Sequence, residues 1–285
     1  MKSASIWRAG LRRAVRRAAQ AASPPPELTV SQWADRNLRL SPEDSGEHGQ
    51  YQSIRAPYQR EIMDACSDPA IESVILMSSS QIGKTTILKS VIGYYIDQDP
   101  SLILVIYPTL ELAEAFSKDR LAPMIRDTPC LRGKIADPKA RDSGNTLLSK
   151  RFPAGRITIV GANSPAGLAA RPIRVVLVDE ASRCARSAGT EGDPIALGFK
   201  RTRTFWNRKK VMCSTPTLRL GHSPHLPTSC LPGAAVAPCL MTRVRSRGSM
   251  WPGRLGGGEG GRHRNLVRIP MTAAVNVAVM AATAM

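Results

Sequence analysis

Several features that mark other classes of protein are scarce in this chain of 285 residues. Aromatic residues make up only 5% of it, and none of its six cysteines forms a CxxC pair, which argues against a zinc site. No apolar run reaches the roughly 18 residues that a membrane-spanning helix needs. Because the chain also has no secretory signal, we expect no membrane association and a reduced, cytoplasmic setting.

Acidic residues are scarce as well: 40 Lys and Arg stand against 22 Asp and Glu, for a formal net charge of +18. Such an excess suggests a polyanionic partner. Most of it lies at the two ends of the chain. Residues 1–22 hold six basic residues and no acid, and residues 221–285 hold seven Arg and one acid, Glu259. The middle is only mildly basic, so DNA binding has to be argued from motifs.

Composition divides the chain into three predicted parts. Residues 1–50 read as a basic arm, with an amphipathic helix over 5–22, followed by an adaptor with little regular structure. In this adaptor, residues 29–34 fit one helical turn with a Ser or Thr cap. Residues 51–220 hold strands alternating with helices. Residues 221–285 form a low-complexity tail rich in Gly, Pro, Ala and Arg. We read this tail either as a sequence translated out of frame or as a natural disordered segment.

The middle part predicts an α/β fold. Continuous apolar runs at 74–77, 102–107 and 175–178 are typical of strands that are buried on both faces. Strands that alternate with helices favour a mostly parallel sheet with helices on both faces. The remaining expected elements are strands at 156–160 and 210–214, helices at 57–66, 84–97 and from 110 to about 125, and a loop-rich stretch at 126–145.

A phosphate-binding loop is predicted between the first core strand and the helix after it. The string SSSQIGKT, which begins at Ser78, fits GxxxxGK[ST] except that serine replaces the first glycine. In such a loop, backbone N–H groups cradle the phosphates, Lys84 adds a positive charge, and the Thr85 hydroxyl binds Mg²⁺. We therefore predict ATP and Mg²⁺ as cofactors; the alternative is an ordinary helix start. The predicted ATP-binding residues of the loop are Ser80, Gln81, Ile82, Gly83, Lys84, Thr85 and Thr86.

An acidic pair follows the buried run Val175–Val178. Asp179 is predicted to hold Mg²⁺ through water, and Glu180 to act as the general base that polarises the attacking water. A buried carboxylate is costly without a metal or a charged partner. The alternative is a solvated strand end with no special role.

A polar sequence, Ser214-Thr215-Pro216-Thr217, ends the last predicted strand. We predict that it senses the γ-phosphate and couples hydrolysis to movement of DNA. The alternative is a plain turn that contains proline.

Tyr58 and Gln59 precede the first core strand by about 14 residues. A Gln side chain can bond to the edge of adenine and a Tyr ring can stack on it, which predicts an adenine contact. The alternative is the start of an ordinary amphipathic helix.

Phosphoryl transfer also needs a positive charge on the γ-phosphate in the transition state. Arg171, shortly before the acidic strand, is the predicted catalytic arginine. Arg201 and Arg203 are rivals that would act on a neighbouring subunit. The sequence leaves open which arginine acts, and whether it acts within its own chain.

The motifs in this order resemble the large terminase subunit of lambda-type tailed phages, the GpA family. The resemblance covers about residues 27–220, and its most specific strings are YPTLELAEAFSKDRLAPMIRDTP and SPAGLAARPIRVVLVDE. It implies a P-loop NTPase fold of the RecA/ASCE-like type. It also implies a motor domain that hydrolyses ATP to translocate viral double-stranded DNA into a procapsid.

The resemblance implies partners as well: double-stranded DNA, a small terminase subunit, the portal protein and other copies of the chain, in the bacterial host cytoplasm. Family members carry a metal-dependent nuclease after the ATPase. Past residue 220 the spaced carboxylates of a two-metal nuclease are missing, so no nuclease activity is expected of this chain. Two alternatives remain: a helicase-like ATPase, and an inactive prophage remnant that binds DNA or a partner without turnover.

Overall fold

The structure, a computed structural model, describes residues 27–136, 145–169, 171–215, 239–244 and 266–269. Its strands are β1 (Arg39–Leu40), β2 (Gly49–Gln50), β3 (Ile71–Met77), β4 (Leu102–Tyr107), β5 (Ser149–Phe152), β6 (Gly155–Gly161), β7 (Val175–Val178), β8 (Lys209–Ser214), β9 (Cys239–Val244) and β10 (Leu266–Ile269). The last eight form one sheet in the order β10-β9-β3-β8-β7-β4-β6-β5. The five strands from β3 to β6 in that order run parallel, and antiparallel strands flank them. The predicted α/β fold is confirmed.

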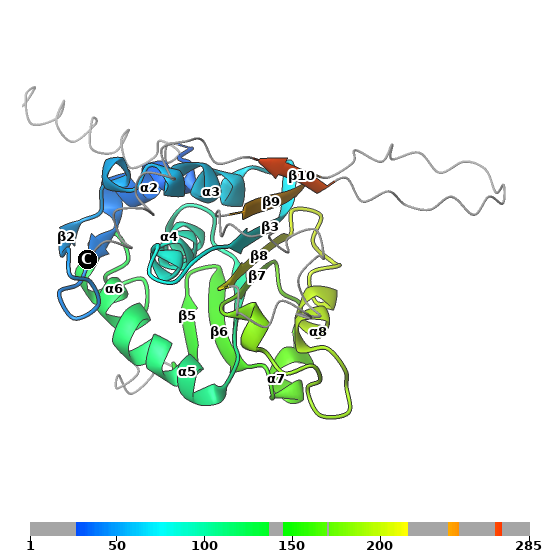
Figure 1. The fold of residues 1–285 in the computed structure, drawn as a ribbon. Helices are drawn as coiled ribbons and strands as arrows, with labels where there is room; N and C mark the ends of the chain where they lie inside the picture. The colour runs from blue at the N-terminus through cyan, green and yellow to red at the C-terminus, as the bar shows by residue number, and fades with distance from the viewer. Residues whose placement is uncertain (1–26, 137–144, 170, 216–238, 245–265, 270–285) are drawn as a thin grey trace, which may run out of the picture.

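Helices cover both faces of this sheet (Figure 1). They are α2 (Val30–Asn37), α3 (Tyr58–Ser67), α4 (Lys84–Asp97), α5 (Leu110–Ala115), α6 (Ala122–Asp127), α7 (Pro165–Ala169) and α8 (Pro194–Lys200). Short 3-10 turns lie at Ser53–Arg55 and Ala181–Arg183, and a π-helical turn, Phe116–Leu121, joins α5 to α6. Helices α2, α3 and α4 pack on one another over one face, and α7 packs on α8 over the other.

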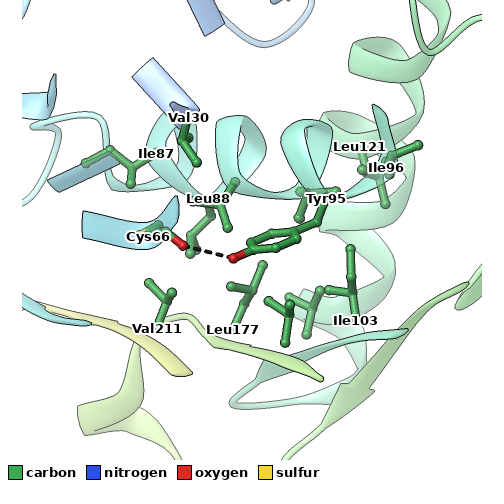
Figure 2. Packing of buried hydrophobic residues seen from close by; sticks show 14 of the residues in the cluster. Val30, Cys66, Ile87, Leu88, Tyr95, Ile96, Ile103, Leu121, Leu177 and Val211 are labelled. Atoms are coloured by element: carbon green, nitrogen blue, oxygen red, sulfur yellow. Dashed lines mark hydrogen bonds between the residues drawn. The ribbon is translucent and has the colours of Figure 1, made fainter. Parts of the chain in front are cut away.

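The larger of two hydrophobic clusters lies between α4 and the sheet (Figure 2). Leu88 and Tyr95 of α4 face Leu177 of β7 and Val211 of β8 there. The Tyr95 hydroxyl donates a hydrogen bond of 2.9 Å to the carbonyl oxygen of Cys66, so its burial leaves no polar atom unpaired. This cluster fixes α4, and with it the loop that precedes α4, against the central strands.

The predicted positions of the buried strands and of the long helix are confirmed: β4, β7 and α4 begin and end where the apolar pattern places them. Strand β3 begins earlier than predicted, because the buried Glu72 interrupts the apolar run and is paired with Arg208 and Lys210. Strand β5 and helix α8 were not predicted. The sequence of β5, Ser-Lys-Arg-Phe, lacks the apolar pattern of a strand.

The capped helical turn expected at 29–34 is confirmed, and it extends into the 8-residue helix α2, which packs in the core where an irregular adaptor was expected. Thr29 and Gln32 form a reciprocal capping box at its start. Trp33 is fully buried, and its indole N–H donates a 2.8 Å hydrogen bond to Asp97 at the end of α4. Gly93 makes room for this ring, since a Cβ there would lie 2.0 Å from Trp33 Cη2.

The predicted tail also differs in part from the structure. Strand β9, Cys239–Val244, pairs antiparallel with β3 from Ile71 to Met77, so this stretch adds a strand to the sheet. Strand β10 pairs with β9 in turn. The rest of the predicted tail, and the predicted helix at 5–22, lie outside the described residues. Within the described parts of the chain, no helix is long and apolar enough to cross a membrane.

Candidate nucleotide site at the strand ends

The order of the central strands brings three predicted motifs together. Strand β8 lies between β3, which leads into the phosphate loop, and β7, which ends in the acidic pair. Ser214 is paired in register with Met77, and Met212 with Val178. Because all three strands are parallel, their carboxyl ends lie at one edge of the sheet, where α/β sheets bind ligands.

The phosphate loop has the backbone geometry of an anion nest. Gln81 has φ of 61° and Gly83 has φ of 83°, both in the left-handed region. Alternation of left- and right-handed residues turns successive N–H groups toward one concavity, which suits phosphate oxygens. A Cβ at position 83 would lie 2.3 Å from the Gln59 side-chain nitrogen, so the loop requires glycine there on two grounds.

Lys84, the first residue of α4, lies across this loop. Its ammonium group donates 2.8 Å hydrogen bonds to the carbonyl oxygen of Ser79 and to Oγ1 of Thr215. Only 7% of the residue is exposed. Two of its three donors therefore tie the loop to the end of β8, which holds the charge in place at the mouth of the loop.

The Thr215 hydroxyl continues this connection to the acidic pair. It accepts from Lys84 and donates to Oε1 of Glu180 at 3.1 Å, as one hydroxyl group can do both. Lys84, Thr215 and Glu180 thus form one hydrogen-bonded chain across three strand ends. The other oxygen of Glu180, Oε2, is buried without a hydrogen-bond partner among the described residues; the Arg183 Nε lies 4.0 Å from it.

Asp179 is the more deeply buried acid of the pair. Burial, and then the charge of Glu180, raise its pKa from 3.8 to about 6, although the backbone N–H of Glu180, Tyr107 and Lys84 oppose the shift. The Glu180 N–H donates to Oδ1 of Asp179 at 3.0 Å. Glu180 itself has φ of 49°, a strained conformation for a residue with a side chain, and such strain occurs most often at functional sites.

These groups suit magnesium and a nucleotide. A buried carboxylate with a raised pKa and an unpaired carboxylate oxygen are both expected where a cation and an ordered water bind. Thr85, half-buried at the start of α4, adds a hydroxyl oxygen. Within the described residues, no group of three or more His, Cys, Asp or Glu gathers into a metal site. Few protein ligands are typical of Mg²⁺ that is held jointly with substrate phosphates.

Tyr58 and Gln59 lie against the phosphate loop itself. The Tyr58 hydroxyl and the Gln59 amide nitrogen each donate a 3.0 Å hydrogen bond to the carbonyl oxygen of Ile82. The Gln59 amide oxygen accepts from the Tyr51 hydroxyl at 2.8 Å. Both ends of the Gln59 amide are thus bonded to protein atoms, and the adenine contact stays a prediction.

Arg171 does not lie with the phosphate loop of its own chain. It is exposed and lines a cavity of about 330 Å³ together with Leu102 and Arg156, near the amino-terminal ends of β4 and β6. The phosphate loop follows the carboxyl end of β3, at the opposite edge of the sheet. The rival Arg201 donates instead to the carbonyl oxygen of Leu168, and Arg203 is exposed.

Three contributors at the strand ends were not predicted. Ser182 is hydrogen-bonded to the end of β8. Its N–H donates to Oγ of Ser214, and its hydroxyl donates to the carbonyl oxygen of Thr215. Arg183 approaches Glu180, and Tyr107 ends β4 beside the acidic pair. Ser182 and Arg183 come shortly after the acidic pair in the sequence, separated from it by Ala181, and this proximity is the only signal that marks them. Pro216 and Thr217 of the predicted coupling motif lie outside the described residues.

The fold and these strand ends define an α/β protein with the P-loop arrangement. The family described as "Phage terminase large subunit gpA, ATPase domain" matches residues 45–244, and the chain belongs to this family. The large terminase subunits of Escherichia phage lambda and Enterobacteria phage P21 are each 32% identical to it, over 213 and 200 residues.

The matched regions differ in their share of each protein. They take in 74% and 68% of this chain but 32% and 30% of the lambda and P21 subunits, so the chain spans about a third of their length. The crystal structure of the large terminase of bacteriophage HK97 shares the fold, with a TM-score of 0.50 at 15% identity. That likeness covers 66% of this chain and 38% of the HK97 chain.

Proposed function

We propose that the chain hydrolyses ATP at the strand-end site, and that hydrolysis drives double-stranded DNA into a viral procapsid. One observation carries the proposal: the hydrogen-bonded chain from Lys84 through Thr215 to Glu180. It joins the group that would bind phosphate to the group that would activate water. Membership of the terminase ATPase family supports the same activity.

Each residue has a distinct role in the proposal. The loop N–H groups and Lys84 bind the β- and γ-phosphates. Thr85 and Asp179 hold Mg²⁺, which would neutralise charge on the phosphate oxygens. Glu180 orients the attacking water and accepts its proton, and its Oε2, which has no hydrogen-bond partner among the described residues, is the oxygen available for this. A bound phosphate would attract the Lys84 ammonium group away from Thr215. The Thr215 hydroxyl would then lose the hydrogen bond that Lys84 donates to it, and the position of the end of β8 would depend on the nucleotide.

Arg171 fits this proposal only as a residue that acts on another copy of the chain. Its place near the amino ends of β4 and β6 puts it far from its own phosphate loop. In a homo-oligomer built from repeated contacts, that edge of one copy can face the nucleotide of the next. We therefore propose that Arg171 supplies the transition-state charge in trans.

The partners are part of the same proposal. The small terminase subunit and the portal protein are proposed from the family resemblance, as is the cytoplasm of a bacterial host. Because the chain spans about a third of the length of the lambda relative, these partners are proposed for the assembled packaging complex and not for this chain alone.

The first test is Mg²⁺-dependent ATP hydrolysis by the full chain, with and without double-stranded DNA. We expect turnover that DNA stimulates and that Lys84→Ala abolishes. Lys118→Ala, which removes an exposed lysine of the π-helical turn, is the matched control and should retain full activity. Folded protein that binds DNA without turnover would instead identify an inactive remnant. Separation of duplex strands would identify a helicase-like enzyme.

A mixing experiment tests the role of Arg171. Arg171→Ala and Lys84→Ala chains should each be inactive when alone. Mixed in equal amounts, they should recover part of the turnover, because an intact Arg171 of one chain meets an intact phosphate loop of another. If Arg171→Ala keeps full activity by itself, or if the mixture stays inactive while wild-type chains form oligomers, action in trans is wrong.

A further inference from the structure

A groove of about 1140 Å³ lies away from the strand-end site, between the start of α2, one side of α3 and the end of α4. Its floor is apolar and is made by the buried or half-buried residues Leu28, Ala65, Ile71 and Tyr94. Apolar surface gathered in a groove of this size favours an occupant that covers it.

The rim of the groove is acidic, in contrast to the chain as a whole. Five carboxylates line it: Glu27, Glu61, Asp64, Asp68 and Asp99. Arg60 is the only basic residue of the lining, and its guanidinium is turned toward Ser53 and Asp35. Three of the carboxylates also have other partners. The charge of Asp99 is paired with Arg174, whereas Asp64 and Asp68 accept from the neutral backbone N–H groups of Ser31 and Ala70. The exposed Glu27, Glu61 and Asp68 therefore leave a negative rim around the apolar floor.

A matching occupant has an apolar stripe flanked by positive charge. The chain carries such a segment shortly before the groove. Leu11, Val15 and Ala18 recur at helical spacing, which predicts one apolar face. At 3.6 residues per turn, Arg12 and Arg17 flank that face, and Arg13 and Arg16 lie on the opposite side of the helix. We propose that residues 11–18 dock as a helix of about two turns in the groove of their own chain, with Arg12 and Arg17 against its acidic rim.

The connection between segment and groove is long enough. Residue 27 lines the groove itself, so only residues 19–26 have to bridge the distance. Eight extended residues span about 25 Å at roughly 3.1 Å each. The wall that α3 provides from Arg60 to Asp68 is about 12 Å long at 1.5 Å per residue. The same chain also supplies the segment at an effective concentration in the millimolar range, which favours docking in cis over binding of a second copy.

Limited digestion by trypsin of the full-length chain at low salt tests the proposal, because a docked segment resists cleavage after Arg12 and Arg16. We expect Glu61→Lys with Asp68→Lys to speed cleavage at these sites about tenfold, since two attractive contacts become repulsive. Asp119→Lys with Glu191→Lys makes the same change in net charge at exposed positions outside the groove lining, and should leave the rate unchanged.

A charge swap separates docking from general loss of stability. Arg12→Glu with Arg17→Glu, combined with the two lysine substitutions in the groove, should restore protection of Arg13 and Arg16. The same two glutamate substitutions with the native groove are the control for slower cleavage beside glutamate, and cleavage should be faster there than in the combined variant. Equal cleavage rates in wild type and in the groove variant would overturn the proposal. So would protection that increases with protein concentration, which would identify a second copy of the chain as the occupant. None of these outcomes depends on ATP turnover.

Discussion

Substitution of Gly93 by Ala tests whether the segment around α2 is part of the ATPase core. A Cβ at position 93 would lie 2.0, 2.5 and 3.0 Å from three ring atoms of Trp33, which is fully buried and bonded to Asp97. Ala favours a helix over Gly by about 1 kcal/mol, but overpacking a core costs about 1–3 kcal/mol.

The approach of 2.0 Å puts the overpacking cost in the upper part of that range, about 2–3 kcal/mol. After the helix gain is subtracted, we expect Gly93→Ala to lower the free energy of unfolding by about 1–2 kcal/mol, or the Tm by about 2–8 °C. Gly46→Ala is the matched control, since nothing lies within 4 Å of a Cβ there. Trp33→Phe should relieve the clash, so the double variant should be more stable than the sum of the single changes by about 1 kcal/mol. Effects that add within error would refute the packing argument, as would a Gly93→Ala chain as stable as wild type.

Three further predictions concern the strand-end site. Thr215→Val removes the hydroxyl between Lys84 and Glu180. Steady-state kinetics should show turnover reduced about 10- to 100-fold, with a smaller change in ATP binding. Unchanged turnover would contradict the role of the hydroxyl. Gly83→Ala should weaken binding of a fluorescent ADP analogue about tenfold, because its φ is 83° and its Cβ would meet Gln59; equal affinity would contradict the loop geometry. Burial raises the pKa of Asp179 to about 6, so the ionised carboxylate destabilises the fold and stability falls as pH rises from about 4 through 6. Without Mg²⁺ and nucleotide, Asp179→Asn should therefore raise the free energy of unfolding at pH 8 by about 1–3 kcal/mol and change it little at pH 4, as measured by urea denaturation; a loss of stability at pH 8 would contradict this.

The sequence was most informative where one physical requirement dominates. Strands β4 and β7 are buried on both faces, so a continuous apolar run marks their bounds. Gly83 and Lys84 were identified because a phosphate loop needs backbone freedom and a positive charge at fixed spacing. The acidic pair and Ser214 lie at the ends of β7 and β8, as predicted, where parallel sheets bind ligands, and their roles stay predictions.

The order of the strands in the sheet, and the contacts that this order creates, could not be predicted from the sequence. The position of β8 between β3 and β7 sets the contact of Thr215 with both Lys84 and Glu180, and no local pattern encodes strand order. Arg171 lies only nine positions before Glu180 in the sequence, yet the length of β7 carries it to the opposite edge of the sheet.

Buried polar and aromatic residues outside the apolar pattern were also misjudged. Glu72 interrupts the apolar run at the start of β3, although ion pairs with Arg208 and Lys210 satisfy it within the strand. No sequence pattern around Trp33 predicts that its ring packs against Gly93, sixty residues away.

The central claim is that Lys84 and Glu180 belong to one site but do different work. The most direct test measures ATP binding and ATP hydrolysis on the same preparations of wild type, Lys84→Ala and Glu180→Gln. Glu180→Gln should bind ATP with nearly unchanged affinity while hydrolysing it at least about 100-fold more slowly, because only the general base is lost. Lys84→Ala should lose binding and hydrolysis together. Normal hydrolysis by Glu180→Gln, or unchanged ATP affinity in Lys84→Ala, would contradict the account.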